Sequence, residues 1–545
     1  MAARPVTPTP EAVEANRAGN AAMKAGDTAE AVARFDEAVR LAPKVLEFAI
    51  NHALALARLD RHADALRTLL ALEEAGRRDP RYCSVRATAH RSLGQLHEAA
   101  QWYDRALALN PSKPIPLHGR ARIALERGGE DAVQRYESAL AANPSDAEAW
   151  LGLAEALDSA GEPSRARQIV EQLVAQAPNW IAALRLLAQF RLAGGEEDFA
   201  SHFADAARRV PNDSAIVRAH AAVLDAHDRF AESHAVAAEA RQRFAQDPEM
   251  ALLEATQASA AGEEARATEL FAGLCLDTPE RWLQESRHAL RARDIARADD
   301  LTAKLVETRP HDIAGWALRD IVWRMLGDER AEWLHGQDGL VRQLELPGSE
   351  SLLEQVVPVL ERLHKRAAFP LGQSLRGGTQ TRARLFDRVE PELAVLHAAL
   401  AEAIAQYRSA LPPFDEMHPL LRHRDTEWII AGAWSVRLAS GGDHHKAHLH
   451  PEGIVSSASY FVLPDDLGND EADGVEDRAG WIELGRPSPN LKLNLEPLHV
   501  IKPQLGHLVL FPSTLYHGTR PFGQGERMTV AFDVAHGKTA GHGER

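Results

Sequence analysis

Cysteine is almost missing from this chain of 545 residues, which contains only Cys83 and Cys275. The two lie about 190 residues apart and form no CxxC pair. A disulfide framework and a cysteine-ligated zinc site are therefore both excluded. We expect both thiols to be buried small side chains in a protein of a reducing compartment.

Long apolar runs and an excess of positive charge are missing as well. No stretch approaches the roughly 18 uncharged apolar residues of a membrane span, and the N-terminal sequence MAARPVTPTPEAVEANRAG lacks the apolar segment of a signal peptide. Lys and Arg number 62 against 78 Asp and Glu, a formal net charge of −16 that repels a phosphate backbone. The composition predicts a cytoplasmic protein with neither nucleic acid nor a membrane as partner.

What the chain does contain, in its first half, is a repeat. A pattern of two small residues, one large residue and one proline recurs with a period of about 34 residues. It occurs as Ala31, Phe35, Ala38 and Pro43, as Ala99, Tyr103, Ala106 and Pro111, as Ala132, Tyr136, Ala139 and Pro144, and as Ala166, Val170, Leu173 and Pro178. Small alanines allow two helices to approach closely, and proline ends the second helix of each pair.

These positions resemble the tetratricopeptide (TPR) repeat, and Trp150 and Leu153 match the opening of its motif. The resemblance implies an α-helical solenoid that binds extended peptides or helices in its concave groove. We assign residues 1–10 to a flexible N-terminus and residues 11–345 to a TPR-like solenoid that degenerates after about residue 180.

Near residue 346 the alanine-rich pattern ends in segments rich in Pro and Gly, which marks a domain boundary. An amphipathic helix is expected from Pro391 to Leu411, followed by short strands. The strand-like segments are EWIIAGAWSVRLA, IVSSASYFVLP, GWIELG, LHVIKP, HLVLFPS and RMTVAFDV. They predict an antiparallel barrel or jelly roll from about residue 425 to 536, within a domain of residues 346–545.

Three histidines in these segments are candidate metal ligands. In an extended KAHLHP segment, His448 and His450 project to the same side because side chains two apart share a face of a strand. His517, after the strand-like HLVLFPS, supplies a third imidazole from across the barrel. Imidazole suits iron, zinc and copper about equally, so the ligand type alone leaves the metal open.

Arg527, which begins the strand-like segment after His517, indicates an anionic cosubstrate. Its guanidinium matches the carboxylate of a dicarboxylic acid in a bidentate contact, and Thr529 on the same face adds a donor. Tyr460 is either a core aromatic residue or a hydroxyl donor to the cosubstrate. Arg437, in an otherwise apolar strand, needs an anionic partner if it is buried, and is a further candidate for cosubstrate binding.

The arrangement resembles the double-stranded β-helix fold of the Fe(II)/2-oxoglutarate dioxygenases, in particular the bacterial proteins that join TPR repeats to a "putative 2OG-Fe(II) oxygenase" domain. Four segments carry the resemblance: QSLRGGTQT at 373–381, WSVRL at 434–438, HLHPEGIVSSASY at 448–460 and LFPSTLYHGTRPF at 510–522. The resemblance implies Fe(II) held by His448, His450 and His517, 2-oxoglutarate held by Arg527, and hydroxylation as the reaction.

One position departs from the family. Its best-known members have an aspartate two residues after the first histidine, where this chain has His450. Either His450 is the third ligand, which we favour, or a water or a carboxylate such as Asp443 completes the shell. A cupin lacks support because Ile454 and Val455 stand where its glutamate should be, and a closed structural zinc site needs a fourth protein ligand.

The TPR resemblance favours a protein or peptide as the substrate, docked by the repeats. This expectation rests on the pairing of domains and not on site chemistry. An oxygenase for a small molecule, and an inactive TPR adaptor whose barrel only binds a ligand, are the alternatives. The sequence gives no indication of an oligomeric state.

Overall fold

The computed structural model describes residues 7–365, 367, 371, 375–439, 443–468 and 478–537. The chain divides into two compact units. Of the described residues, the first unit comprises 7–166 and Asp387–Val389, and the second comprises those of 167–386 and 390–537. The later helices of the solenoid and the whole β region therefore belong to one unit.

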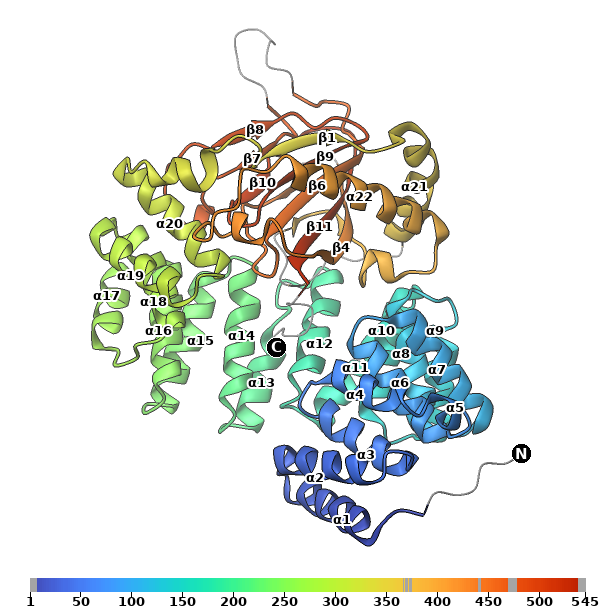
Figure 1. The fold of residues 1–545 in the computed structure, drawn as a ribbon. Coiled ribbons are helices and arrows are strands. Elements are labelled where there is room, and N and C mark those ends of the chain that lie inside the picture. Colours follow the sequence, from blue (N-terminus) through green and yellow to red (C-terminus); the bar gives the residue numbers. More distant parts are fainter. Residues whose placement is uncertain are drawn as a thin grey trace. The chain divides into compact units, whose positions relative to one another are not determined.

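The first unit is built from antiparallel helix pairs (Figure 1). They are α1 (Pro10–Ala25), α2 (Thr28–Leu41), α3 (Leu46–Ala57), α4 (His62–Leu70), α5 (Glu73–Gly76), α6 (Pro80–Ser92), α7 (Leu96–Leu109), α8 (Pro114–Glu126), α9 (Ala132–Ala142) and α10 (Ala147–Ser159), and α11 (Pro163–Gln176) crosses the division. Side chains of Thr9, Asp27 and Asp146 cap three of the helix N-termini. The alanine, aromatic and aliphatic positions of the repeats are buried because they line the contacts between helices, whereas the prolines Pro43, Pro111 and Pro144 are exposed.

The helical pairs continue in the second unit. They are α12 (Ile181–Ala193), α13 (Ser201–Arg209), α14 (Ser214–Ala226), α15 (Phe230–Arg243), α16 (Pro248–Ala261), α17 (Glu264–Gly273), α18 (Pro279–Arg291), α19 (Ile295–Thr308) and α20 (Ile313–Leu326), followed by a π-helical turn, η1 (Glu332–Gly336). The TPR-like solenoid that the sequence predicts is thereby confirmed. Its exact limits at residues 11 and 345 remain a prediction.

The β region has a large and a small antiparallel sheet. Six strands form the large sheet in the order β1-β9-β6-β11-β4-β3, three form a second sheet in the order β10-β7-β8, and β2 pairs with β5. The strands are β1 (Arg342–Glu345), β2 (Leu375–Arg376), β3 (Thr379–Gln380), β4 (Trp428–Leu438), β5 (His444–His445), β6 (Val455–Val462), β7 (Ile482–Leu484), β8 (His499–Ile501), β9 (His507–Pro512), β10 (His517–Thr519) and β11 (Arg527–His536). All six strand-like segments of the sequence are strands, so the antiparallel β region is confirmed.

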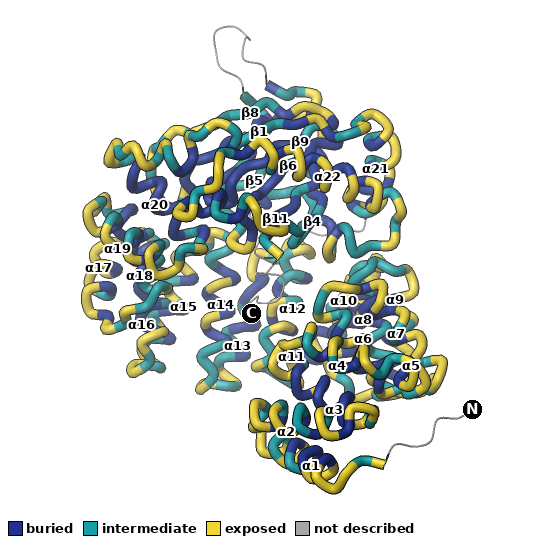
Figure 2. The backbone as a smooth tube through the Cα atoms, viewed as in Figure 1, coloured by how far each residue is buried: buried dark blue, intermediate teal, exposed yellow. Residues whose placement is uncertain are grey.

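The large sheet has apolar contacts on both faces, and its central strands β6, β9 and β11 are mostly buried (Figure 2). Alternate residues of β11, such as Met528, Val530 and Phe532, pack against α21 (Ser349–His364) and α22 (Pro391–Ser409). On the other face, Tyr460 and Phe511 pack with Ile482 and Leu484 of the small sheet. The inner residues of β11, which alternate with Met528 and Phe532, therefore face the space between the two sheets.

Two further expectations can be compared with the structure. Cys83 is buried as predicted, but the prediction for Cys275 is wrong. Cys275 follows the end of α17 in an irregular segment, where its side chain is exposed instead of packed between helices. Among the described helices, none combines the length and the apolar character needed to cross a bilayer.

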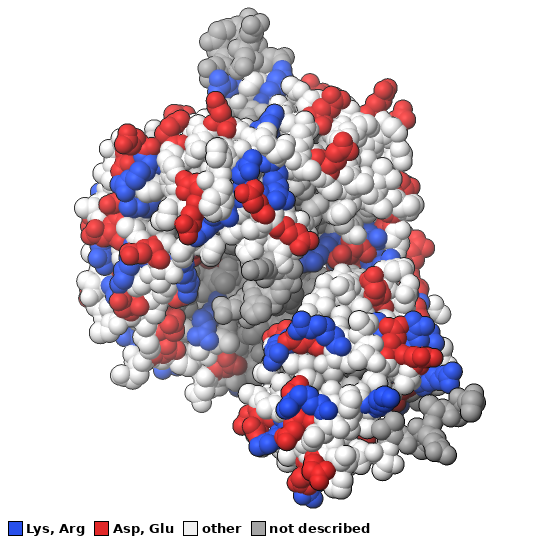
Figure 3. Space-filling view, in the orientation of Figure 1, with Lys and Arg blue, Asp and Glu red and all other residues white. Residues whose placement is uncertain are grey.

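Acidic and basic side chains are interspersed on the surface. They alternate over the face drawn in Figure 3, and many form ion pairs one helical turn apart, such as Arg34 with Glu30 and Arg40 with Asp36. Exposed pairs of this kind contribute little to stability but neutralise the surface locally.

Candidate metal site

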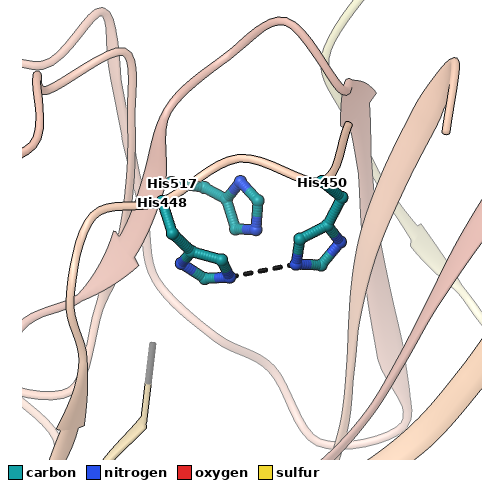
Figure 4. A group of neighbouring side chains, drawn as sticks. All are labelled: His448, His450 and His517. Atoms are coloured by element: carbon teal, nitrogen blue, oxygen red, sulfur yellow. Dashed lines mark hydrogen bonds between the residues drawn. The ribbon is translucent and has the colours of Figure 1, made fainter. Parts of the chain in front are cut away.

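Three imidazoles converge between the two sheets (Figure 4). One ring nitrogen from each of His448, His450 and His517 lies within 4.8 Å of the others. The backbones of His448 and His517 exchange two hydrogen bonds, of 3.0 and 3.1 Å, which fixes the two segments side by side. His450 then follows two residues after His448 and points to the same centre, as the extended-segment interpretation requires.

The hydrogen bonds of the rings determine which nitrogen faces the centre. The Nδ1 atoms of His448 and His517 lie 2.8 and 3.2 Å from the backbone carbonyls of Lys446 and Leu515. Nδ1 of His450 lies 2.7 Å from Oδ1 of Asp533. A carbonyl or carboxylate only accepts, so each Nδ1 carries the proton and each Nε2 is left with a lone pair.

The Nε2 atoms of His448 and His450 are only 3.0 Å apart. If both carry lone pairs, they repel each other unless a cation or a proton lies between them. Burial lowers the pKa of His448 well below its ordinary value, which disfavours the proton. Two nitrogens that each lie about 2.1 Å from one ion and meet at a right angle are roughly 3.0 Å apart. The donor set therefore fits a divalent metal.

Asp533 contacts the imidazole cluster, although the sequence analysis did not single it out. Its Oδ1 accepts from His450 and from the Ser456 hydroxyl, at 2.7 and 2.9 Å. A carboxylate behind an imidazole orients the ring and raises its basicity as a ligand. The signal available in the sequence was alternation, because Asp533 lies on the same face of β11 as Arg527 and Thr529.

Aromatic rings surround the three histidines. Trp434 meets the ring of His450 edge-on at 5.2 Å, and Phe511 lies 4.9 Å from the ring of His517. His445 stacks on His448 at 5.5 Å, and burial lowers the pKa of His445 to about 3. These rings hold the imidazoles in place and reduce the access of water to them.

Arg527 is a buried cation, with 3% of its surface exposed. Its Nη1 donates to the carbonyl of Gly480 at 3.1 Å, while Nε has no hydrogen-bond partner. Among the described residues no carboxylate pairs with it, and burial lowers its pKa from the usual value. A buried guanidinium without a counter-charge costs several kcal/mol, so this site fits an anionic ligand.

Tyr460 and Thr529 lie beside Arg527. Thr529 pairs with Tyr460 across β11 and β6, and the Arg527 Cζ atom lies 5.1 Å from the centre of the Tyr460 ring. The Tyr460 hydroxyl is buried and has no hydrogen-bond partner among the described residues, and burial raises its pKa. The two residues thus lie side by side, and each has a buried polar atom without a hydrogen bond of normal geometry, Nε of Arg527 and the hydroxyl of Tyr460.

The expectation that Arg437 joins this site is wrong. In β4, Arg437 pairs with Met528, whereas Leu438 pairs with Arg527, so Arg437 lies on the opposite face of the sheet. It forms an ion pair with Glu526 instead, through Nε at 3.1 Å. The anionic partner that its charge requires is supplied by the protein's own surface.

Other candidate positions lie away from the three imidazoles or outside the described residues. Asp443 accepts from the backbone N–H of Ala439 at 3.0 Å and is not part of the metal-ligand cluster. Gln373, which opens the first of the four signature segments, and Asn469–Asp477 of the acidic segment are outside the described residues.

Comparisons with protein families match the N-terminal and the C-terminal parts of the chain to different families. Residues 22–88 and 129–190 match one tetratricopeptide repeat family, and residues 80–113 match another. Residues 432–533 match the family described as "Putative 2OG-Fe(II) oxygenase". The chain thus carries TPR repeats followed by a domain of this oxygenase family, and the matched segment contains all three histidines, Arg527 and Asp533.

Individual relatives match the repeats. The Hsp70-Hsp90 organizing protein of Triticum aestivum is 38% identical over 99 residues, which are 18% of this chain and only 17% of that protein. Among solved structures, a tetratricopeptide repeat protein from Parabacteroides merdae matches 58% of this chain and 99% of its own, with 14% identity and a TM-score of 0.29. A thermophilic TPR protein of Thermus thermophilus matches 33% of this chain and 99% of its own, with 22% identity and a TM-score of 0.29.

Proposed function

We propose that this protein is an Fe(II)- and 2-oxoglutarate-dependent dioxygenase that hydroxylates a protein or peptide docked by its TPR repeats. The observation that carries the proposal is the set of three imidazoles with one ring nitrogen each within 4.8 Å of the others, together with the buried guanidinium of Arg527 in β11, which pairs with no carboxylate of the described residues. The match of residues 432–533 supports the same metal and cosubstrate.

In this proposal the residues of the site have separate roles. His448, His450 and His517 hold ferrous iron through Nε2, and Asp533 keeps the Nδ1 proton on His450. Arg527 binds the distal carboxylate of 2-oxoglutarate, with the Tyr460 hydroxyl and Thr529 as further donors. When bound, the iron and the cosubstrate supply oxygen activation and the oxidation of the substrate.

His450 as third ligand gives the site one negative charge less than a site with a carboxylate in that position. The nearby Asp533 compensates in part, because its carboxylate lies one hydrogen bond away from the ligand. The walls formed by Trp434 and Phe511 exclude water from the metal, which strengthens every electrostatic contact inside.

A polypeptide substrate is supported by the repeats. Within the first unit, a pocket is lined by Tyr103, Ile115, His118 and Arg122, with Ile115 73% exposed. An exposed apolar side chain beside basic and aromatic residues suits an extended peptide. We therefore take the predicted solenoid as the docking region and the β region as the oxygenase domain, whose limit lies before residue 346 because β1 (Arg342–Glu345) pairs with β9. The two unpaired cysteines suit the cytoplasm.

Turnover of the cosubstrate tests the function. The protein is loaded anaerobically with Fe(II) and 2-oxoglutarate, oxygen is admitted, and succinate is measured with and without cell lysate as a source of substrate. Succinate that requires iron supports the proposal. No succinate under any of these conditions would favour an adaptor without catalytic activity.

Two arginine variants test the cosubstrate contact separately. Arg527→Met should weaken binding of 2-oxoglutarate to the Mn(II)-loaded protein on the order of 100-fold, because it leaves a buried carboxylate unpaired. Arg437→Met is the matched control, since Arg437 lies in the adjacent strand but on the opposite face. Equal affinities of both variants in calorimetry would refute the role of Arg527.

A further inference from the structure

The turns that follow the helices of the solenoid are of two kinds, and one of them contacts the segment of the candidate metal ligands. Most of these turns contain a glycine in the left-handed conformation: Gly26, Gly94, Gly128, Gly161, Gly195, Gly262 and Gly327. Three turns instead contain Asp60, Asp228 or Arg293, with φ of 55, 61 and 62°. Residues other than glycine adopt this conformation at a cost, so their side chains are expected to have a use.

The side chain of Asp228, between α14 and α15, contacts the β region. Its Oδ1 accepts from Nζ of Lys446. Its Oδ2 accepts from Nη2 and Nε of Arg376, at 2.7 and 3.1 Å. Nζ of Lys446 also lies 5.7 Å from the centre of the Phe230 ring, at the start of α15. One carboxylate of the solenoid therefore holds two cationic side chains of the β region.

Both cations lie at the segment that leads to the candidate metal ligands, Lys446 within it and Arg376 paired with it. Arg376 of β2 pairs with His444 of β5, and Lys446 follows β5 directly. The carbonyl of Lys446 then accepts from Nδ1 of His448 at 2.8 Å. Asp228 is thus connected to the first imidazole through one residue, whose side chain it binds and whose backbone orients the ring.

The segment that carries His517 is held by the solenoid as well. Nδ1 of His335 in η1 lies 3.0 Å from Oδ1 of Asp320 in α20, and its Nε2 lies 2.8 Å from the hydroxyl of Thr514. Thr514 precedes Leu515, whose carbonyl orients the ring of His517. Elsewhere, Arg293 donates to the carbonyl of Lys492 at 2.8 Å, so its left-handed turn also contacts the β region.

We propose that Asp228 is a positioning residue for the metal site, which sets the orientation of His448 from the helical repeats through Lys446. This inference rests on the proposed function, because it assumes that His448 is a metal ligand. It gives the α14–α15 repeat a role at the oxygenase centre in addition to its place in the docking solenoid.

Replacement by glycine tests the proposal without disturbing the turn. Asp228→Gly removes the carboxylate and leaves a residue that favours the left-handed conformation, as in seven other turns. Asp60→Gly is the matched control: the turn has nearly the same φ, but the Asp60 side chain is 83% exposed. The full-length protein is used, and the probe is Co(II), whose visible spectrum reports ligand geometry.

Asp228→Gly should bind Co(II) on the order of 10-fold more weakly and with an altered visible spectrum, at the lower end of the effects seen for residues that orient ligands. Asp228→Asn, which keeps an oxygen acceptor, should be intermediate. Asp60→Gly should match the wild type in affinity and spectrum. Thermal unfolding, measured in parallel, separates misfolding from a change at the metal.

Wild-type affinity and an unchanged spectrum in Asp228→Gly would overturn the inference while leaving the proposed function intact. An affinity loss without any spectral change would also overturn it, since the geometry of His448 would then not depend on Asp228. Failure of the wild-type protein to bind Co(II) would overturn the proposed function and this inference together.

Discussion

The early repeats (α1–α11) and the late repeats (α12–α20) are both built from helix pairs, but their side chains pack differently. In the early repeats a tyrosine packs directly over a glycine of the next pair. A Cβ atom on Gly119 or Gly152 would lie only 2.2 or 2.3 Å from Tyr103 or Tyr136. In the late repeats the aromatic residue stacks on a histidine instead, as for Phe203 with His220 and Phe271 with His288.

The late repeats also direct polar groups toward the β region. Arg291 donates to the carbonyl of Asn490 at 2.8 Å, Arg324 donates to that of Gly485, and Asp228 binds Lys446 and Arg376. These contacts come from the part of the chain in which the repeat pattern of the sequence is weak.

Removal of one imidazole should have the largest effect on Co(II) binding and should leave the early repeats unchanged. His517→Ala is expected to lower Co(II) affinity more than 100-fold, because loss of a ligand exceeds the roughly 10- to 100-fold effect of losing a ligand's partner. Unfolding of the early repeats, followed by hydrogen exchange, should not change. His507→Ala is the control, since its Nδ1 also lies near a carbonyl two residues earlier, that of Leu505. Equal Co(II) affinities would contradict the site.

Loss of the carboxylate behind His450 should have the next largest effect. Asp533→Asn is expected to weaken Co(II) binding about 10-fold to 100-fold, because the amide supports the ring less well than the carboxylate. Calorimetry measures the affinity. Asp425→Asn, at an exposed carboxylate, should have no effect. If the two variants behave alike, Asp533 does not support the metal ligand.

A substitution in the early repeats should destabilise the first unit and leave metal binding unchanged. Gly152→Ala should destabilise the first unit by about 2 kcal/mol, because the new methyl group overlaps the buried ring of Tyr136. Gly161→Ala, where no atom lies within 4 Å but φ is +86°, separates the cost of the backbone from that of the overlap. Both variants should bind Co(II) normally. Weaker Co(II) binding in Gly152→Ala would show that the early repeats influence the metal site.

Low pH should destabilise the second unit through the protonation of His418. Burial lowers the pKa of His418 to about 4. Its Nδ1 accepts from the N–H groups of Leu420 and Leu421, so the folded state needs the neutral ring. Since the unfolded state takes up the proton near pH 6.5, the stabilisation is present above that pH and is lost as the pH falls toward 4.

The contribution of this one histidine to the free energy of unfolding should fall by about 2 kcal/mol between pH 7 and pH 5. His418→Gln should therefore flatten the pH dependence of thermal unfolding of the second unit. The same substitution at the exposed His97, in the first unit, should leave the profile of the wild type. A profile of His418→Gln that is as steep as that of the wild type would exclude this contribution.

Much of the molecule could be predicted from the sequence where the pattern is local. The repeat period predicts the helix pairs, and alternation predicts the strands and the shared direction of His448 and His450. The misplacement of Arg437 has a specific cause. Which face it occupies depends on its pairing with Met528, and a register shift of one residue exchanges the two faces of a strand.

Contacts between distant segments could not be predicted in this way. Asp533 and Asp228 are two of many acidic residues, and nothing adjacent to them in sequence marks their partners. Asp533 acts because β11 lies beside β6 and near the segment of His450. Asp228 acts because the α14–α15 turn contacts the segment after β5. Both depend on tertiary structure that a local pattern does not encode.

Anomalous scattering from crystals grown anaerobically with Mn(II) and 2-oxoglutarate tests the central claim most directly. One metal peak is expected at about 2.1–2.3 Å from Nε2 of His448, His450 and His517, with a carboxylate of 2-oxoglutarate on Arg527. A peak that contacts fewer than two of these imidazoles, or a 2-oxoglutarate molecule bound away from Arg527, would contradict the account.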